Sequence, residues 1–234
     1  MKAVVLAAGK GTRLMPLTEN KPKVLIEING KPFLWYVLNL FKKLGIKEIA
    51  LIVGYKKEKI QEFVAKYGFA VTLVEQKEQK GTGHATLQAK EFVGDENFIV
   101  YHGDGLWSEK DLQRFMVEDE FTYMAGKHVE DWQRYGILLE EKGFLKEKVE
   151  KPQKFIGDLA WVGFFKTTPE IFVELEKVKL SPRGEIEVTD AINALAKKKK
   201  VKIISLQDYW LDLGAPEDIP KIEKFIKGHP EYFS

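Results

Sequence analysis

Residues 2–14 read KAVVLAAGKGTRL, an apolar run that passes without a break into a loop of small residues. Lys2–Leu6 predicts a β-strand because it is short, apolar and rich in valine. The alanines and glycines that follow let backbone N–H groups approach an anion without interference from larger side chains. A strand that ends in such a loop predicts a phosphate-binding site at the carboxyl edge of a sheet.

Two well-known glycine motifs do not describe this loop. The dinucleotide fingerprint requires a third glycine where Leu14 stands, and a P-loop requires an upstream glycine and a serine or threonine after its Gly-Lys pair. Glycines alone would fit an ordinary turn equally well. Arg13 inside the loop and Lys23 shortly after it add two cations to the backbone dipoles, and this combination favours a site for two neighbouring phosphates.

Outward from this loop, the first half of the chain alternates short apolar runs with helical patterns. We predict strands over residues 48–53, 69–74 and 98–101, and helices over residues 32–45 and 57–67. Such alternation is typical of a parallel sheet with crossover helices. Because ligands of open α/β sheets bind beyond the carboxyl ends of the strands, the loops after these strands should converge on one crevice.

From residue 121 onward the pattern changes to closely spaced strands, with a hairpin predicted at Gly143. This half should be mixed or antiparallel. Further predicted elements are strands over 146–150 and 201–206, a short helix starting at Thr168, and helices over 187–199 and 216–227. No internal repeat or low-complexity linker divides the sequence, so we expect a single domain over residues 1–234.

The composition narrows the class of protein. The 37 lysines and arginines against 35 aspartates and glutamates give a net charge of +2, so no global field favours nucleic acid or an anionic membrane. No apolar run approaches the roughly 20 residues of a membrane span, and the N-terminal run is too short for a signal peptide, so a cytoplasmic protein is expected. The absence of cysteine excludes disulfides and thiolate sites, and with 31% charged residues it favours a heat-adapted source.

Asp104 follows the predicted strand that ends at Tyr101. Magnesium prefers carboxylate oxygens shared with substrate phosphates, and a rigid strand end holds such a carboxylate in place. The simpler interpretation is an aspartate that only caps a turn. Because its loop should meet the phosphate loop, we expect Asp104 to bind Mg²⁺. The four histidines lack the paired spacing of a zinc site and are interpreted as structural.

The stretch from Lys2 to Pro32 resembles the N-terminal signature of the sugar-phosphate nucleotidyltransferase family. The matching positions are Leu6-Ala7-Ala8-Gly9, Gly11-Thr12-Arg13-Leu14, Pro16-Leu17-Thr18, Pro22-Lys23 and Gly30-Lys31-Pro32. The resemblance implies that this loop binds a nucleoside triphosphate, with Arg13 and Lys23 on its phosphates. It also fits the expected fold class, an α/β protein with a Rossmann-like mixed, mostly parallel sheet flanked by helices and a small antiparallel sugar-binding lobe. Residues 1–120 would form the nucleotide-binding half and residues 121–234 the sugar-binding half.

Further segments extend the resemblance along the chain. Gln76 with Gly81-Thr82-Gly83-His84-Ala85 resembles the segment that reads the base, since a glutamine amide offers both a donor and an acceptor to a pyrimidine edge. The form of this segment is similar to uridylyltransferases that act on N-acetylglucosamine 1-phosphate. On the residues alone, a capped helix start is the simpler interpretation.

The second half carries the matching acidic and sugar segments. Asp212 in Trp210–Pro216 looks like the family's second metal ligand, which would share the ion with Asp104. The resemblance assigns Lys151 to the sugar phosphate and Glu150 to sugar hydroxyls. The other positions that it assigns to the sugar pocket are Tyr135, Gly136, Gly163 and Glu185. Trp161 is a departure, because many members carry asparagine two residues before this glycine, and it leaves the identity of the sugar open.

The resemblance implies a magnesium-dependent enzyme that joins UTP or dTTP to a sugar 1-phosphate by direct in-line displacement and releases pyrophosphate. Two alternatives stay open: a CTP-dependent cytidylyltransferase acting on a polyol or amino-alcohol phosphate, and a non-catalytic subunit that binds a nucleotide sugar. We expect a monomer or small homo-oligomer that binds neither nucleic acid nor membrane. Because the sequence ends soon after its last predicted helix, a left-handed β-helix acyltransferase domain is not expected.

Overall fold

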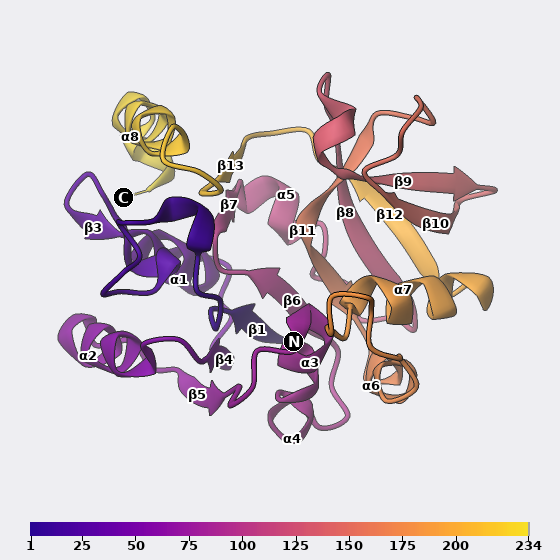
Figure 1. The fold of residues 1–234 in the computed structure, drawn as a ribbon, viewed down its shortest axis with the longest axis horizontal. Helices are drawn as coiled ribbons and strands as arrows, with labels where there is room; N and C mark the ends of the chain where they lie inside the picture. The colour runs from indigo at the N-terminus through magenta and orange to yellow at the C-terminus, as the bar shows by residue number, and fades with distance from the viewer. Residues whose placement is uncertain (234) are drawn as a thin grey trace.

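Strand β1 (Lys2–Leu6) lies at the centre of the parallel part of a large mixed sheet. It pairs in parallel with β4 (Ile49–Val53) on one side and with β6 (Phe98–His102) on the other, and β5 (Thr72–Glu75) extends the sheet beyond β4. The computed structural model describes residues 1–233, and over these the sheet has nine strands (Figure 1). The predicted mixed α/β architecture is confirmed.

The second half of the chain continues the sheet beyond β6. Its strands are β8 (Thr122–His128), β9 (Gly136–Glu141), β10 (Phe144–Glu150), β11 (Leu159–Thr167) and β12 (Val201–Ser205). β11 pairs antiparallel with β6, β8 and β9, β10 pairs antiparallel with β9, and β12 runs parallel to β8. These strands form a lobe beside the parallel strands, on the right of Figure 1.

Helices cover both faces of the sheet because residues along each central strand alternate between two cores. In β1, Ala3 and Val5 join one core and Val4 joins the other. The first core contains residues of α1 (Phe33–Lys43), α2 (Lys57–Tyr67), α5 (Glu109–Gln113) and α8 (Asp218–Gly228). The second contains residues of α3 (Gly81–Leu87), α4 (Lys90–Val93), α6 (Glu170–Leu175) and α7 (Val188–Lys197).

Short elements complete the chain. Two small antiparallel sheets pair β7 (Gly105–Trp107) with β13 (Trp210–Asp212), and β2 (Glu27–Ile28) with β3 (Lys31–Pro32). Single turns of 3₁₀ helix cover Thr12–Leu14, Lys23–Leu25, Trp132–Arg134 and Pro230–Tyr232. Within residues 1–233, no helix is both long and apolar enough to cross a membrane.

Two predicted boundaries were wrong for local reasons. The strand expected over residues 69–74 starts only at Thr72, because the Phe69 N–H still donates to the Val64 carbonyl at 3.2 Å and closes the end of α2. The helix expected from Pro216 starts at Asp218, whose carboxylate accepts from the N–H groups of Gly214 and Ala215 at 3.1 and 2.8 Å. In both places a turn at a helix terminus uses backbone groups that the sequence pattern assigned to the neighbouring element.

Lys166 is a fully buried lysine in β11. Its ammonium donates to Oδ1 of Asp119 at 2.7 Å and to the carbonyl oxygens of Asp119 and Phe121 at 2.8 and 2.9 Å. The Tyr123 hydroxyl donates to the same carboxylate at 2.6 Å. Although burial by itself raises the pKa of Asp119, the hydrogen bonds from Lys166 and Tyr123 hold that pKa below its usual range. The ionised carboxylate therefore stabilises the folded chain.

Asp119→Ala should lower the free energy of unfolding by about 3 kcal/mol at neutral pH, because the buried Lys166 loses its counter-ion. Since the pKa of Asp119 is lower in the folded chain, its contribution is present above the unfolded-state pKa and is lost as the pH falls through the folded-state pKa. Urea unfolding from neutral to acid pH should show the gap between wild type and variant shrinking. Asp95→Ala removes an exposed aspartate and is the control; a gap that stays constant in acid would contradict the assignment.

Candidate active site

The loops after β1, β5 and β6 meet at one cleft, as the strand order requires. The cleft encloses a cavity of 390 Å³. Its lining comprises Leu6, Ala7, Ala8, Gly9, Lys10, Gly11, Thr12, Arg13, Leu14, Lys23, Val24, Gln76, Gln79, Gly81, Thr82, Ala85, His102, Asp104, Glu185 and Gly214. Every residue assigned from the sequence to the nucleotide therefore lies at one cavity.

The loop after β1 is held in a fixed shape by its own backbone. Gly11 has φ 64°, a left-handed conformation that favours glycine, and its carbonyl accepts from the Leu14 N–H and from the buried Thr18 hydroxyl, each at 2.9 Å. A Cβ atom on Gly11 would lie 2.8 Å from Cβ of Lys23. A Cβ atom on Gly9 would meet nothing within 4 Å, although Gly9 lines the cavity. Gly9 thus leaves open space for a ligand, whereas Gly11 is needed for the turn.

Two cations and one carboxylate face each other across this loop. Arg13 is exposed at the cavity, and the ammonium of Lys23 donates to Oδ2 of Asp104 in an ion pair. Burial by itself raises the pKa of Asp104, but the charge of Lys23, the neighbouring His102 and the hydrogen bond from Lys23 together lower that pKa. Asp104 is therefore an anion at neutral pH, next to the loop that favours anions.

Gln76 forms the opposite wall of the cavity. Its side chain is buried, and its amide nitrogen donates to the Gly81 carbonyl at 3.1 Å and lies 3.0 Å from Nδ1 of His84. Gly81 has φ 89°, and a Cβ atom there would lie 2.8 Å from the Ile186 carbonyl oxygen. The amide of Gln76 is thus fixed in orientation, and the glycine permits close approach of the chain opposite.

That opposite chain belongs to the second half of the sequence. The Ile186 N–H donates to the Lys80 carbonyl at 2.7 Å, and the Gly83 N–H donates to the Ile186 carbonyl at 2.8 Å. These two backbone hydrogen bonds bring Glu185 to the cavity, beside Gly81. The two halves of the chain therefore share one wall of the cleft.

Asp212 does not line the cavity, but the small sheet of β7 and β13 places it near Asp104. In its register Asp212 lies opposite Gly105, and the Leu213 N–H donates to the Asp104 carbonyl at 2.8 Å. Asp212 remains exposed as a residue, yet protein crowding around its carboxyl and the charge of Asp104 raise its pKa to about 6. The structure therefore brings two remote carboxylates close enough to repel each other.

This pair fits a magnesium ion by its donor chemistry. Mg²⁺ is usually held by one or two carboxylates together with substrate phosphates and water, rather than by a full cage of protein ligands. In the described part of the chain, no three metal-binding side chains gather at one place. The ligands that the protein could supply to a metal here are therefore Asp104, which lines the cavity, and Asp212 near it. A divalent cation there would remove the repulsion that raises the pKa of Asp212.

A second cavity of 790 Å³ adjoins the first, and Thr82 lines both. It contains Lys148, whose ammonium donates to Oε2 of Glu150 at 2.8 Å and to the Thr189 hydroxyl at 3.1 Å. The same ammonium lies 4.4 Å from the ring centroid of Trp161. A Cβ atom on Gly136 would overlap Lys148, so glycine is required there for packing. Glu150 therefore lines this second cavity, whereas Gly136 packs behind Lys148 and Glu150 without lining it.

The remaining predicted sugar residues, Lys151, Tyr135 and Gly163, line neither of these two cavities. Lys151 is exposed at the end of β10, with its N–H bonded to the Tyr135 carbonyl at 3.1 Å. The Tyr135 ring packs edge-on against Trp210, 5.5 Å between centroids, next to the segment of Asp212. Gly163 has φ 89°, and a Cβ atom there would lie 3.4 Å from the His102 ring.

Sequence reasoning missed three residues at these cavities. Gln79 donates to the Ala8 carbonyl at 2.7 Å and supports the phosphate loop. His102, interpreted as structural, lines the first cavity, and its Nε2 has no partner among the described residues. Burial lowers its pKa, with help from Lys23 and Lys148, so the ring is neutral at neutral pH. The position of His102 at the end of a predicted strand could have indicated a residue of the site. Nothing in the sequence around Lys148 indicates that it lies at a cavity.

Comparisons with known proteins find matches over most of the chain. A sequence profile of the nucleotidyl transferase family matches residues 2–228. The chain is 42% identical to the Bifunctional protein GlmU of Methanocaldococcus jannaschii over 97% of its length, but it spans only 54% of that relative. It is 38% identical to the UTP–glucose-1-phosphate uridylyltransferase AglF of Haloferax volcanii, with 97% of both chains covered. A UDP-glucose pyrophosphorylase solved with UDP-glucose superposes with a TM-score of 0.86 at 27% identity, covering 97% of this chain and 98% of that one.

Two glycine substitutions should separate the shape of the loop from its ability to hold an anion. Gly9→Ala should keep the wild-type melting temperature but weaken binding of inorganic tripolyphosphate, because its methyl group enters the open space of the cavity. Gly11→Ala should lower the melting temperature, because φ 64° and the contact with Lys23 strain the loop. Calorimetric titration and thermal melts measure the two effects. Equal behaviour of the two variants would contradict this division of roles.

Proposed function

The chain belongs to the nucleotidyl transferase family, among its sugar-1-phosphate nucleotidylyltransferase members, and we propose that it joins a pyrimidine nucleoside triphosphate, UTP or dTTP, to a sugar 1-phosphate. The observation that carries the proposal is the convergence of Arg13, Lys23 and Asp104 on one cavity, with Asp212 held near Asp104 by the neighbouring strand β13. A single domain would suffice, with residues 1–120 holding the nucleotide and residues 121–234 the sugar.

The nucleotide occupies the first cavity in this proposal. Its phosphates lie over the loop of residues 6–12, where small residues expose backbone N–H groups and Arg13 adds a cation. The base lies toward Gln76, Gly81 and Thr82, where the fixed amide of Gln76 meets a pyrimidine edge. The relative AglF is named for UTP, which supports a uracil base.

Asp104 and Asp212 are the residues that would hold Mg²⁺. When bound, the ion supplies Lewis-acid neutralisation of phosphate charge. Lys23 pairs with Asp104 in this structure, so the ammonium and a metal compete for one carboxylate. Arrival of a triphosphate gives Lys23 a new anionic partner and frees the Asp104 oxygen.

The reaction proposed is a direct displacement. A phosphate oxygen of the sugar 1-phosphate forms a bond to the α-phosphorus, and the bond from that phosphorus to the bridging oxygen of pyrophosphate breaks. Arg13 and Lys23 stabilise the charge that gathers on the leaving pyrophosphate. Positioning and charge then account for the rate, because no side chain needs to form a covalent intermediate.

The sugar occupies the boundary between the two cavities. Glu150 and Glu185 can accept hydrogen bonds from sugar hydroxyls, while Gly136 and Gly163 allow Lys148 and His102 to pack close to the backbone beside the sugar. Lys151, exposed beside Tyr135, reaches the sugar phosphate as a mobile point charge. Trp161 closes this side with an aromatic face where an asparagine amide would offer hydrogen bonds, so we expect a different sugar preference from members with asparagine.

Asp104→Asn should reduce turnover at least about a hundredfold, because a neutral amide binds a divalent cation poorly and no longer opposes Lys23. Pyrophosphate release, measured with a panel of UTP, dTTP and CTP against sugar 1-phosphates and polyol phosphates, tests both the residue and the substrates. Asp95→Asn is the surface control. Wild-type rates in the Asp104 variant would exclude the metal assignment, activity with CTP alone would favour a cytidylyltransferase, and binding without turnover would favour a regulatory subunit.

Lys151→Ala should raise KM for the sugar 1-phosphate by about tenfold or more and leave KM for the triphosphate unchanged, because it removes one charge-assisted contact to the sugar phosphate. Lys154→Ala removes an exposed lysine from the same loop and serves as the control. Steady-state kinetics with each substrate varied in turn makes the comparison. Equal changes in both KM values would contradict the assignment of Lys151 to the sugar phosphate.

A further inference from the structure

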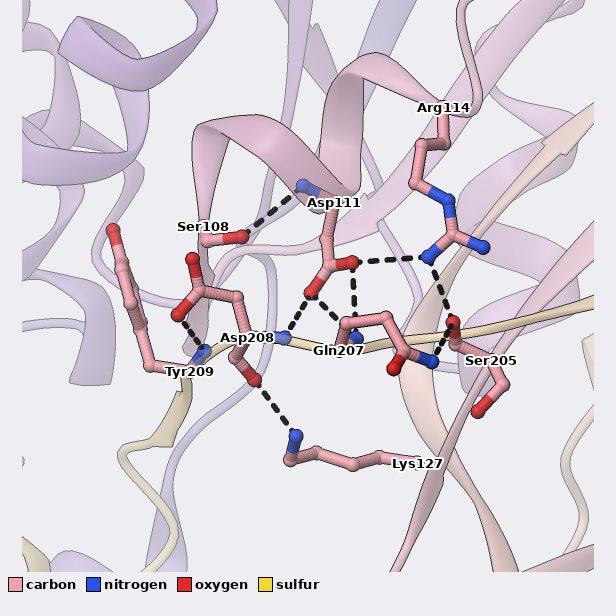
Figure 2. A network of polar contacts seen from close by, with 8 residues as sticks. All are labelled: Ser108, Asp111, Arg114, Lys127, Ser205, Gln207, Asp208 and Tyr209. Atoms are coloured by element: carbon pink, nitrogen blue, oxygen red, sulfur yellow. Dashed lines mark hydrogen bonds and ion pairs between the residues drawn. The ribbon is translucent and has the colours of Figure 1, made fainter.

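Asp111 is a buried carboxylate that lies outside both cavities. It is 2% exposed and sits in α5, the short helix that follows Asp104 and β7. Its two oxygens each accept from the Gln207 N–H at 3.1 Å, and Oδ2 also accepts from the Asp208 N–H at 2.8 Å (Figure 2). Oδ1 accepts from Nη1 of Arg114 at 3.1 Å. The buried Asp111 carboxylate thus accepts hydrogen bonds from two backbone N–H groups that lie far away in the sequence.

The carboxylate is not needed to build its own helix. The N-cap of α5 is Ser108, whose hydroxyl accepts from the Asp111 N–H at 3.1 Å. An acidic side chain at this position of a helix commonly reaches back to the N-cap N–H. The Asp111 side chain instead contacts the connector, which we define as residues 206–209 between β12 and β13. The Asp111 side chain therefore stabilises the connector rather than its own helix.

The connector is held at several further points. The Leu206 N–H donates to the Gly126 carbonyl at 2.7 Å, and the Lys127 ammonium donates to the Asp208 carbonyl at 2.7 Å. Nη1 of Arg114 bridges the Asp111 carboxylate to the Ser205 carbonyl, the latter at 2.8 Å. Figure 2 shows Arg114, Gln207 and Asp208 at the Asp111 carboxylate, and Lys127 at the Asp208 carbonyl. The chain that enters β13 therefore has a fixed starting point.

That starting point determines where Asp212 lies. β13 has three residues and, within residues 1–233, pairs only with β7, with Trp210 opposite Trp107 and Asp212 opposite Gly105. A two-stranded ladder of this length is marginal by itself. A slip of one residue would turn Asp212 to the other face of the strand, away from Asp104. Something beyond the ladder must fix the register.

We propose that Asp111 is a positioning residue that sets the register of β13 and so holds Asp212 beside Asp104. One segment carries both Asp104 and Asp111, and the connector that Asp111 binds leads directly into β13 with Asp212, so the contact links the two segments that carry the carboxylates. The importance of this contact for turnover rests on the proposed function. The register itself does not, and it can be measured separately.

The test compares Asp111→Ala and Asp111→Asn with the wild-type protein. Alanine removes every acceptor and leaves the N–H groups of Gln207 and Asp208 without their carboxylate partner, whereas asparagine keeps one oxygen and should retain part of the contact. Asp119→Ala is the control, because it lowers stability at a place that contacts neither the connector nor β13.

Hydrogen exchange of peptides covering residues 206–214 should speed up by about tenfold in Asp111→Ala and by less in Asp111→Asn, with no change in Asp119→Ala. The Mg²⁺ concentration for half-maximal turnover should rise by about 10- to 100-fold in the same order, and excess Mg²⁺ should restore part of the rate. Unchanged exchange in both Asp111 variants, or equal acceleration in Asp119→Ala, would overturn the proposal. If Asp111→Ala does not fold, Asp111→Asn alone decides. A wild-type protein without turnover would refute the proposed function while the exchange result still stands.

Discussion

The cleft depends on keeping two like charges close together. Asp104 and Asp212 come from opposite halves of the sequence, and their mutual repulsion contributes to the raised pKa of Asp212. Lys23 offsets part of this repulsion by pairing with Asp104. The β7–β13 ladder, the Leu213–Asp104 hydrogen bond and the Asp111 contact hold the pair together against it. Several independent contacts therefore hold the two carboxylates close together. A divalent cation bound between them would neutralise the negative charge that Lys23 leaves unbalanced.

Much of the fold was predictable because its first half is built from local patterns. The strand Lys2–Leu6 and the helix Lys57–Tyr67 have the bounds that periodicity and glycine placement predict. The loop of residues 6–14 follows β1 directly, so its position at the carboxyl end of that strand was predictable from the sequence. Asp104 was predictable for the same reason, since the carboxyl ends of neighbouring parallel strands share one edge of the sheet.

The parts that escaped prediction depend on register and on contacts between distant segments. Lys148 looks like an ordinary strand lysine, and only the fold places it between Glu150, Thr189 and the face of Trp161. Asp111 looks like a favourable acidic residue in the first turn of a helix, and its contact with the connector follows from the position of β12. Such side chains carry no periodic signal, because their partners are chosen by tertiary packing.

The pair of backbone hydrogen bonds that join Lys80 and Gly83 to Ile186 has a mechanical consequence. They fasten residues 1–120 to residues 121–234 at the cavity wall, beside Gln76 and Glu185. The same two halves are also joined through the sheet by the pairing of β6 with β11. Moving one half away from the other would break hydrogen bonds at two separate places, so this wall of the cavity resists opening.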